Sequence, residues 1–432
     1  MFTLRLVFAF VGACCAVAIA PAAFAQPAPS ASPVAAPTPA QPPSASPAPG
    51  ASPAASPSPS ATPFKLITLT GSGDAGYTTV GGTNAVRFTN GNPSRIFDAG
   101  NGPFFDANGG RQLAPANDFN NVPDLQNANV QLTLNGSVVG AKFEGSFGTD
   151  ADVIASNGQS RSGSNLTQAY LQFVGGPVTF LVGKFSTLAG AEVIEAPGNS
   201  NYSRSYLFGE AIPFTHTGVR ATYAVNSKVS VVAGLNNGWD DWKFVQKKKT
   251  LEGALLLTPS PGYSLNLQTY NGNDFAANGN SAIGLPPVFA NRMLYDGVLT
   301  VHATGALTLV ANYDNGTQIA GLAGAVGVAH WNGIAGYATY QFRPQFGLSL
   351  RKETFHDVDG FRTGIAQRLQ SNTATLNYTP GSNYLFRVEY RLDSADGNNF
   401  TYRAAGVDPI SGLPNGRNHQ SSLGIESVFK FP

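Results

Sequence analysis

The chain has 432 residues, of which 42% are hydrophobic and only 12% are charged, and its formal net charge is +1. Soluble domains usually carry about a quarter charged residues, so this composition disfavours an ordinary soluble fold. The near-neutral charge argues against nucleic acid as a partner. No stretch of about 18 apolar residues follows the N-terminal segment, which excludes insertion through membrane helices.

The N-terminal segment has the three parts of a secretory signal peptide. Arg5 is followed by an uncharged apolar run from Leu6 to Ala20, and Ala23-Phe24-Ala25 matches an A-x-A cleavage site. We expect residues 1–25 to be removed on export. A lipoprotein signal with an acylated Cys14 is the alternative. Because both cysteines lie in this segment, the mature chain is predicted to hold no disulfide and no thiolate metal site.

Residues 26–63 consist almost entirely of Pro, Ala and Ser and carry no charge. Such a segment cannot bury enough apolar surface to fold, and its prolines favour an extended chain. We therefore predict a disordered periplasmic linker. It is either a passive tether or an arm that binds the cell wall or another periplasmic partner.

From residue 64 onward, apolar and polar side chains alternate with a period of two. Within residues 384–393 the apolar face carries Tyr384, Phe386, Val388, Tyr390 and Leu392, and the charged face carries Arg387, Glu389, Arg391 and Asp393. This period is that of a β-strand which separates water from an apolar medium. Both a soluble sandwich and an outer-membrane barrel contain such strands.

The connections between the predicted strands decide between these two folds. Seven short turns are predicted, at 135–136, 175–177, 225–227, 259–261, 303–305, 343–344 and 379–381. They alternate with eight long Gly/Asn/Asp-rich loops, at about 74–125, 149–165, 186–215, 237–249, 271–293, 315–327, 356–369 and 394–419.

This alternation of turns and loops predicts a membrane-spanning barrel. It implies an all-β fold over residues 64–432, a closed antiparallel transmembrane β-barrel of about 16 strands with periplasmic turns and extracellular loops. The last strand, which ends at Phe431, would pair with the first near Leu66 and Ile67, because open sheet edges are not tolerated in lipid. An aromatic girdle is expected beside the turns, from Tyr263, Phe342, Phe346, Tyr378 and Tyr384.

One block of the sequence resembles a known family. Residues 180–185 (FLVGKF), 192–195 (EVIE), 201–208 (NYSRSYLF), 211–218 (AIPFTHTG) and 234–240 (GLNNGWD) look like the hallmark block of the porin-2-like outer-membrane β-barrel porins. The resemblance implies an outer-membrane location and a porin-like role. The chain departs from the usual aromatic C-terminus of outer-membrane barrels, because Pro432 follows Phe431.

The third long loop, at about 186–215, is the candidate functional segment. In general porins of about sixteen strands this loop folds inward and narrows the channel, and we take that architecture over by analogy. The loop would bring Glu192, Glu195, Arg204 and Glu210 to the constriction. These would face the lumen-wall residues Lys142, Glu144, Lys184, Arg220, Arg387, Glu389 and Arg391. Opposed charges across a narrow lumen select solutes by charge and size. The alternative is that these are solvated loop charges or a salt-bridged lid.

Two functions stay open from the sequence. The first is a porin that passes small solutes or ions by passive diffusion. The second is a plugged barrel, closed by the loop 74–125, that acts as a structural or surface-interaction protein. No G-x-S-x-G or H-E-x-x-H motif occurs and the five histidines are scattered, so neither an enzyme, a cofactor nor a metal site is predicted.

The expected partners follow from an outer-membrane location. They are outer-membrane lipid and lipopolysaccharide, and Lys247, Lys248 and Lys249 could meet lipopolysaccharide phosphates unless they are simply solvated. Formation of a homo-oligomer is left open.

Overall fold

A computed structural model describes most of the barrel region. The described residues are 67–81, 85–86, 123–159, 162–243, 249–277, 288–322, 325–363, 366–397, 400–402 and 416–431. The predicted signal peptide 1–25 and the linker 26–63 lie outside them, as do Leu66, Lys247, Lys248 and Pro432.

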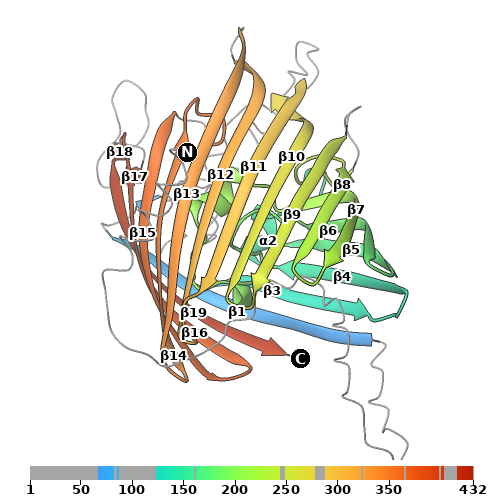
Figure 1. Ribbon diagram of the computed structural model, residues 1–432. Coiled ribbons are helices and arrows are strands. Elements are labelled where there is room, and N and C mark those ends of the chain that lie inside the picture. The colour runs from blue at the N-terminus through green and yellow to red at the C-terminus, as the bar shows by residue number, and fades with distance from the viewer. Residues whose placement is uncertain are drawn as a thin grey trace, which may run out of the picture.

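Sixteen strands of the described chain form one closed antiparallel barrel (Figure 1). They are β1 (Ile67–Gly81), β3 (Pro123–Leu134), β4 (Val139–Phe147), β5 (Ser164–Gly175), β6 (Val178–Ser186), β7 (Thr215–Asn226), β8 (Val229–Asn236), β9 (Thr250–Ser260), β10 (Tyr263–Ala277), β11 (Val288–His302), β12 (Leu307–Leu322), β13 (Ala325–Arg343), β14 (Phe346–Asp357), β15 (Gln367–Gly381), β16 (Tyr384–Ala395) and β19 (His419–Phe431). The predicted closure is confirmed, because β1 pairs with β19 over Gly71↔Phe431 to Gly81↔Ser421. The pairing begins at Gly71 and not at Ile67 as predicted, because β19 ends opposite Gly71.

The two faces of the wall differ as the alternation predicts. On β16 the apolar side chains from Tyr384 to Leu392 point outward and are 40–50% exposed. The inward side chains Arg387, Glu389 and Arg391 are buried. An apolar outside and a polar inside reverse the arrangement of a soluble protein, and they suit a wall between lipid and lumen.

Short and long connections alternate around the barrel as predicted. Six of the seven predicted turns overlap the observed ones, and the seventh moves from 379–381 to 382–383 because β15 continues to Gly381. Along one rim, Phe342, Phe346, Tyr378 and Phe386 stack in sequence, with ring centroids 4.7–6.2 Å apart. This row lies beside two of the short turns and includes three members of the predicted girdle.

Three of the predicted loops are shorter than expected. The loop predicted at 271–293 shrinks to 278–287 and that at 315–327 to 323–324, while β1 and β3 leave only 82–122 of the loop predicted at 74–125. The reason is that Gly, Asn and Asp also occupy the inward face of long strands. Asp314 is buried on this face, whereas its neighbour Tyr313 is 44% exposed on the other, so the alternation continues through the predicted loop.

A few small elements lie outside the barrel wall. They are the α-helix α2 (Thr149–Val153), the 3-10 helix η1 (Ala196–Gly198), the π-helix η2 (Leu207–Ala211) and a small sheet in the order β18 (Gly416–Arg417), β17 (Phe400–Tyr402), β2 (Ala85–Val86). The small sheet joins the loop after β1 to the loop before β19. Within the described residues, no helix has the length and apolarity needed to cross a membrane.

Candidate functional site

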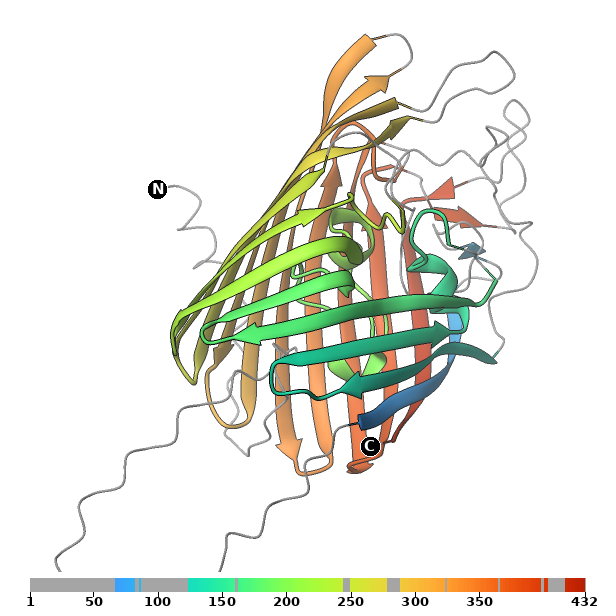
Figure 2. The same ribbon diagram turned by 90° about the vertical axis from the view of Figure 1, so that its right-hand side faces the viewer.

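The connection between β6 and β7, residues 187–214, packs against the inside of the barrel, and we call it the inner loop. Its η1 lies against β1 and β19, and its η2 lies against β12, β13 and β14. In Figure 2 the helical turn of η2 appears between the strands at the front and those at the back. The inner loop therefore crosses the inside of the barrel, from β6 and β7 to the strands on the opposite side.

Arginines on the inward face of the wall bind the inner loop. Arg351 on β14 makes an ion pair of 2.8 Å with Glu192 and donates hydrogen bonds to the carbonyls of Ser203 and Arg204. Arg391 on β16 donates to the same Arg204 carbonyl at 2.7 Å. Arg387 donates to the carbonyl of Ala196 and is paired with Glu426 at 2.6 Å.

Carboxylates of the wall accept hydrogen bonds from the loop backbone. Glu389 accepts the N–H groups of Tyr202 and Ser203 at 2.7 and 3.0 Å. Glu353 accepts the N–H of Tyr206 at 2.6 Å. A buried backbone without strand partners must find other hydrogen bonds. The wall provides them, so the sequence of the wall determines where the inner loop lies.

Tyr202 occupies a slot at the seam between the first and last strands. Its hydroxyl lies 3.0 Å from the Oγ1 of Thr78 on β1. A Cβ atom on Gly424 would come within 2.5 Å of the Tyr202 ring, and one on Gly76 within 2.7 Å of its hydroxyl. Only residues without a side chain therefore leave room for this ring.

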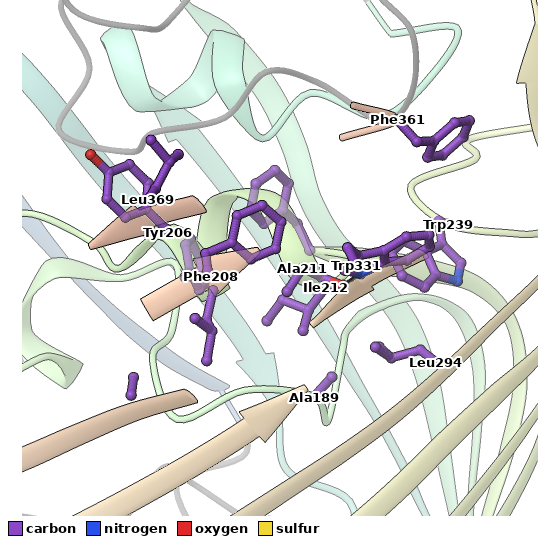
Figure 3. Packing of buried hydrophobic residues seen from close by; sticks show 14 of the residues in the cluster. Ala189, Tyr206, Phe208, Ala211, Ile212, Trp239, Leu294, Trp331, Phe361 and Leu369 are labelled. Carbon is purple, nitrogen blue, oxygen red and sulfur yellow. Dashed lines mark hydrogen bonds between the residues drawn. The ribbon is translucent and has the colours of Figure 1, made fainter. Parts of the chain in front are cut away.

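The far end of the inner loop enters a hydrophobic cluster inside the barrel (Figure 3). Figure 3 shows Ala211 and Ile212 of the loop beside Trp331 of the wall. The indole N–H of Trp331 donates to the carbonyl of Ala211 at 3.1 Å. Burial of several large apolar side chains stabilises this end of the loop. The other end is instead bound by ion pairs and hydrogen bonds from charged side chains of the wall.

The inner-loop residues predicted from the sequence fall into two groups. Glu192, Arg204 and Glu210 are buried, and Arg204 donates to the carbonyls of Tyr202, Val193 and Ile194 within its own loop. Glu195 remains partly exposed. The geometry therefore pairs Glu192 with a wall arginine, and it turns the guanidinium of Arg204 toward the loop itself.

Except for Lys184, the predicted wall residues lie on the inward face, and most of the seven are engaged. Lys184 lies on the same face of β6 as the exposed Phe180 and Val182, because side chains alternate along the strand. Arg220 pairs with Glu252 at 2.7 Å, and Lys184 donates to Gln159 and to the carbonyl of Leu166. Lys142 pairs with Glu144 at 2.8 Å and keeps 20% of its side chain exposed. Lys142 is thus the predicted wall charge whose side chain keeps access to solvent.

Sequence reasoning missed Arg351, Glu353 and Tyr202. Arg351 and Glu353 stand on the same face of residues 349–353, in the alternating pattern that singled out 387–391. The same signal could have found both. No local signal marks Tyr202, because its slot is built by glycines on β1 and β19.

Glu195 lies against Glu144, and the two carboxyl groups share a hydrogen bond. Enclosure of the carboxyl group and the nearby charge of Glu144 raise the pKa of Glu195 to about 8, and Lys142 opposes this shift. The carboxyl group is enclosed although the residue as a whole is only partly buried. Neutral Glu195 therefore joins the inner loop to β4 near neutral pH.

Glu195→Gln should remove the pH dependence that Glu195 contributes to the stability of the folded chain. The folded chain holds this proton more tightly than the unfolded chain, so stability falls as the pH rises from the ordinary value of 4.5 to about 8. Thermal unfolding in detergent between about pH 6 and about pH 9 should shift by several degrees for the wild type and much less for the variant. The exposed rim variant Asp396→Asn should keep the wild-type response. An equal response in Glu195→Gln would contradict the role of this pair.

Comparisons with known proteins agree on the fold. The model of the family described as "putative beta-barrel porin-2, OmpL-like" matches residues 79–431. The outer membrane channel DcaP of Acinetobacter baumannii is 15% identical, with a TM-score of 0.52 over 84% of this chain and 97% of that one. The outer membrane protein OmpT of Vibrio cholerae, in a trimer form, is 12% identical, with a TM-score of 0.53 over 84% and 99%.

The family match extends the similarity beyond the fold. No curated protein matches the sequence. The matched region begins within β1 and ends at the last residue of β19, so it covers nearly the whole barrel together with the inner loop. The chain therefore belongs to the putative beta-barrel porin-2, OmpL-like family of outer-membrane porins.

Proposed function

We propose that the protein forms an aqueous channel for passive diffusion of small solutes or ions, and that the inner loop narrows this channel. The observation that carries the proposal is the attachment of the inner loop to charged residues on the inward face of β14 and β16. A loop held at many points keeps a constant position, and a constriction of defined size requires this.

We propose different roles for the candidate charges. Lys142, with Glu144 and Glu195 beside it, borders the passage and acts on permeating solutes, because its side chain keeps 20% of its surface exposed. The buried charges act by positioning the loop; they are Glu192, Arg204, Glu210, Arg387, Glu389 and Arg391. Lys184 and Arg220 support the wall beside β6 and β7.

The second candidate function is a plugged barrel with a structural or surface role. It is favoured by the hydrophobic cluster inside the barrel, where Trp239 and Trp331 are fully buried. Closely packed apolar side chains leave no room for water in this part of the barrel. The segment proposed as a plug from the sequence, 74–125, falls mostly outside the described residues.

Single-channel recording in planar bilayers tests both functions. Wild-type protein should conduct, and a variant in which residues 193–206 are replaced by a short Gly-Ser linker should conduct more per channel, because the constriction is removed. Replacement of the exposed turn residues 227–228 by Gly-Ser is the control and should leave the conductance unchanged. A folded wild-type barrel that never conducts, with current appearing only after a segment is removed, would support the plugged form.

We also propose how the chain is processed, how its segments are arranged and that it forms a homo-oligomer. Residues 1–25 would be cleaved on export, 26–63 would link the barrel to the periplasm, and 64–432 would form the membrane domain. The trimer form named for one structural neighbour supports a homo-oligomer. The proposed function is transport without catalysis.

A further inference from the structure

The lipid-facing surface of the barrel is interrupted by polar residues on β14 and β15. On β16 the outward side chains stay apolar from Tyr384 to Leu392. On β14 the apolar run ends at Leu350, and Lys352 follows it on the same exposed face. On β15 the run likewise ends at Ala374, and Asn372 stands beyond it.

Register places these polar residues side by side. The pairs Lys352↔Asn372, Thr354↔Gln370 and His356↔Arg368 lie directly opposite each other on the two strands. Side chains at opposed positions of a sheet are close enough to act on one ligand. We call these six residues the polar lane; it runs from within the apolar belt to the end of the strands that carries the long loops.

The height of the polar lane corresponds to the outer leaflet. Lys352 stands six residues beyond Phe346, which belongs to the aromatic row beside the short turns. Six residues span about 20 Å of strand, or about 15 Å of height after tilt, against an apolar belt about 25 Å tall. His356 and Arg368, four residues further on, reach the edge of that belt. The lane therefore covers the depth of the outer-leaflet headgroups and the chains just beneath them.

The cations of the lane have no ion-pair partner among the described residues. Neither Lys352 nor Arg368 makes an ion pair there, and the nearby Asp396 accepts the backbone N–H of Arg368 at 3.0 Å. A lone cation facing lipid is costly unless it reaches a headgroup or an anionic partner. The described residues supply no anion to these two cations. An anion from outside the chain would therefore stabilise them.

We propose that the polar lane binds the headgroup of a phosphorylated glycolipid of the outer leaflet. Lys352 and Arg368 would bind its phosphates, since ammonium and guanidinium groups form charge-assisted hydrogen bonds with phosphate. The amides of Asn372 and Gln370 and the hydroxyl of Thr354 would bind its sugar hydroxyls. The acyl chains would lie on the apolar rows below.

A second copy of the chain fits this surface less well. Every Asp and Glu of the barrel strands whose side chain is described is buried on the inward face. The outward wall of another protomer therefore offers no described strand carboxylate to Lys352 at this height. Charge complementarity favours a lipid phosphate.

Lipid binding by purified protein tests the proposal. The full-length barrel in detergent is titrated with diphosphorylated lipid A and with its dephosphorylated form, and binding is measured by native mass spectrometry. We expect the wild type to prefer the diphosphorylated lipid, and the variant Lys352→Gln/Arg368→Gln to bind it about tenfold more weakly or worse. The matched control Lys228→Gln/Arg343→Gln removes two exposed cations near short turns and should bind like the wild type.

Two results would overturn the proposal. One is equal affinity of the Lys352→Gln/Arg368→Gln variant and the wild type for the diphosphorylated lipid. The other is efficient disulfide dimerisation of an Asn372→Cys variant in the outer membrane, because the lane would then be covered by a second copy. The substituted residues lie on the exposed face, and heat modifiability on a gel checks that the barrel is folded. The test does not depend on conductance, so the channel function and the lipid site can fail separately.

Discussion

Arg351→Met is expected to release the inner loop and to destabilise the barrel by about 3–5 kcal/mol, the usual cost of breaking a buried ion pair. Arg351 is fully buried and joins Glu192, Ser203 and Arg204 of the loop to β14. Without it the carboxylate of Glu192 loses its cation in a buried environment. The free energy of unfolding in detergent with urea should fall, and single-channel conductance should rise and become noisier.

Two comparisons separate the buried ion pair from general damage. Arg343→Met removes an exposed arginine at the end of β13 and should change neither stability nor conductance. Adding Glu192→Gln to Arg351→Met should recover part of the lost stability, because the uncompensated charge is then gone. A stable Arg351→Met barrel with wild-type conductance would mean that this contact does not hold the loop.

Gly424→Ala is expected to displace the tip of the inner loop from the seam of the barrel. The new Cβ would come within 2.5 Å of the Tyr202 ring, which is buried and held by Thr78. Overpacking of this kind costs about 1–3 kcal/mol. We expect lower thermal stability and higher conductance, measured on the same preparation.

A double-mutant cycle checks that Tyr202 is what the added methyl group meets. In a Tyr202→Ala background, Gly424→Ala should cost at least about 1 kcal/mol less, because the ring is absent. Gly73→Ala on β1 is the matched control, since a Cβ there meets no atom within 4 Å. Equal costs of Gly424→Ala in both backgrounds would rule out the slot.

The architecture could be predicted because it depends on local patterns. Alternation at 384–393 identified the inward charges of β16 correctly, since side chains of a strand alternate between its faces whatever lies beyond them. Turn residues such as Asn135 and Gly136 act through their own backbone conformations, so they mark strand ends locally. The same reasoning overestimated the loops at 271–293 and 315–327, because composition does not distinguish an Asn or Asp in a loop from one on a polar inward face.

The candidate site could be predicted only in part. Placing 186–215 inside the barrel came from an architectural analogy, and the charges of its segment were visible in the sequence. Their roles were not. Arg204 looked like a charge for the lumen, yet it binds carbonyls of its own loop. Arg351, 159 positions from Glu192, went unnoticed although it is the loop's main partner.

By itself, the sequence determined the barrel of alternating strands, its even strand number and the approximate location of its long loops, because period and turn chemistry act over a few residues. Only the tertiary structure decided which inward charges bind one another and which keep contact with water. Those choices depend on distances across the barrel, such as that between Tyr202 and the glycines of β1 and β19. Closure of the wall brings these groups together, and no local pattern encodes such a distance.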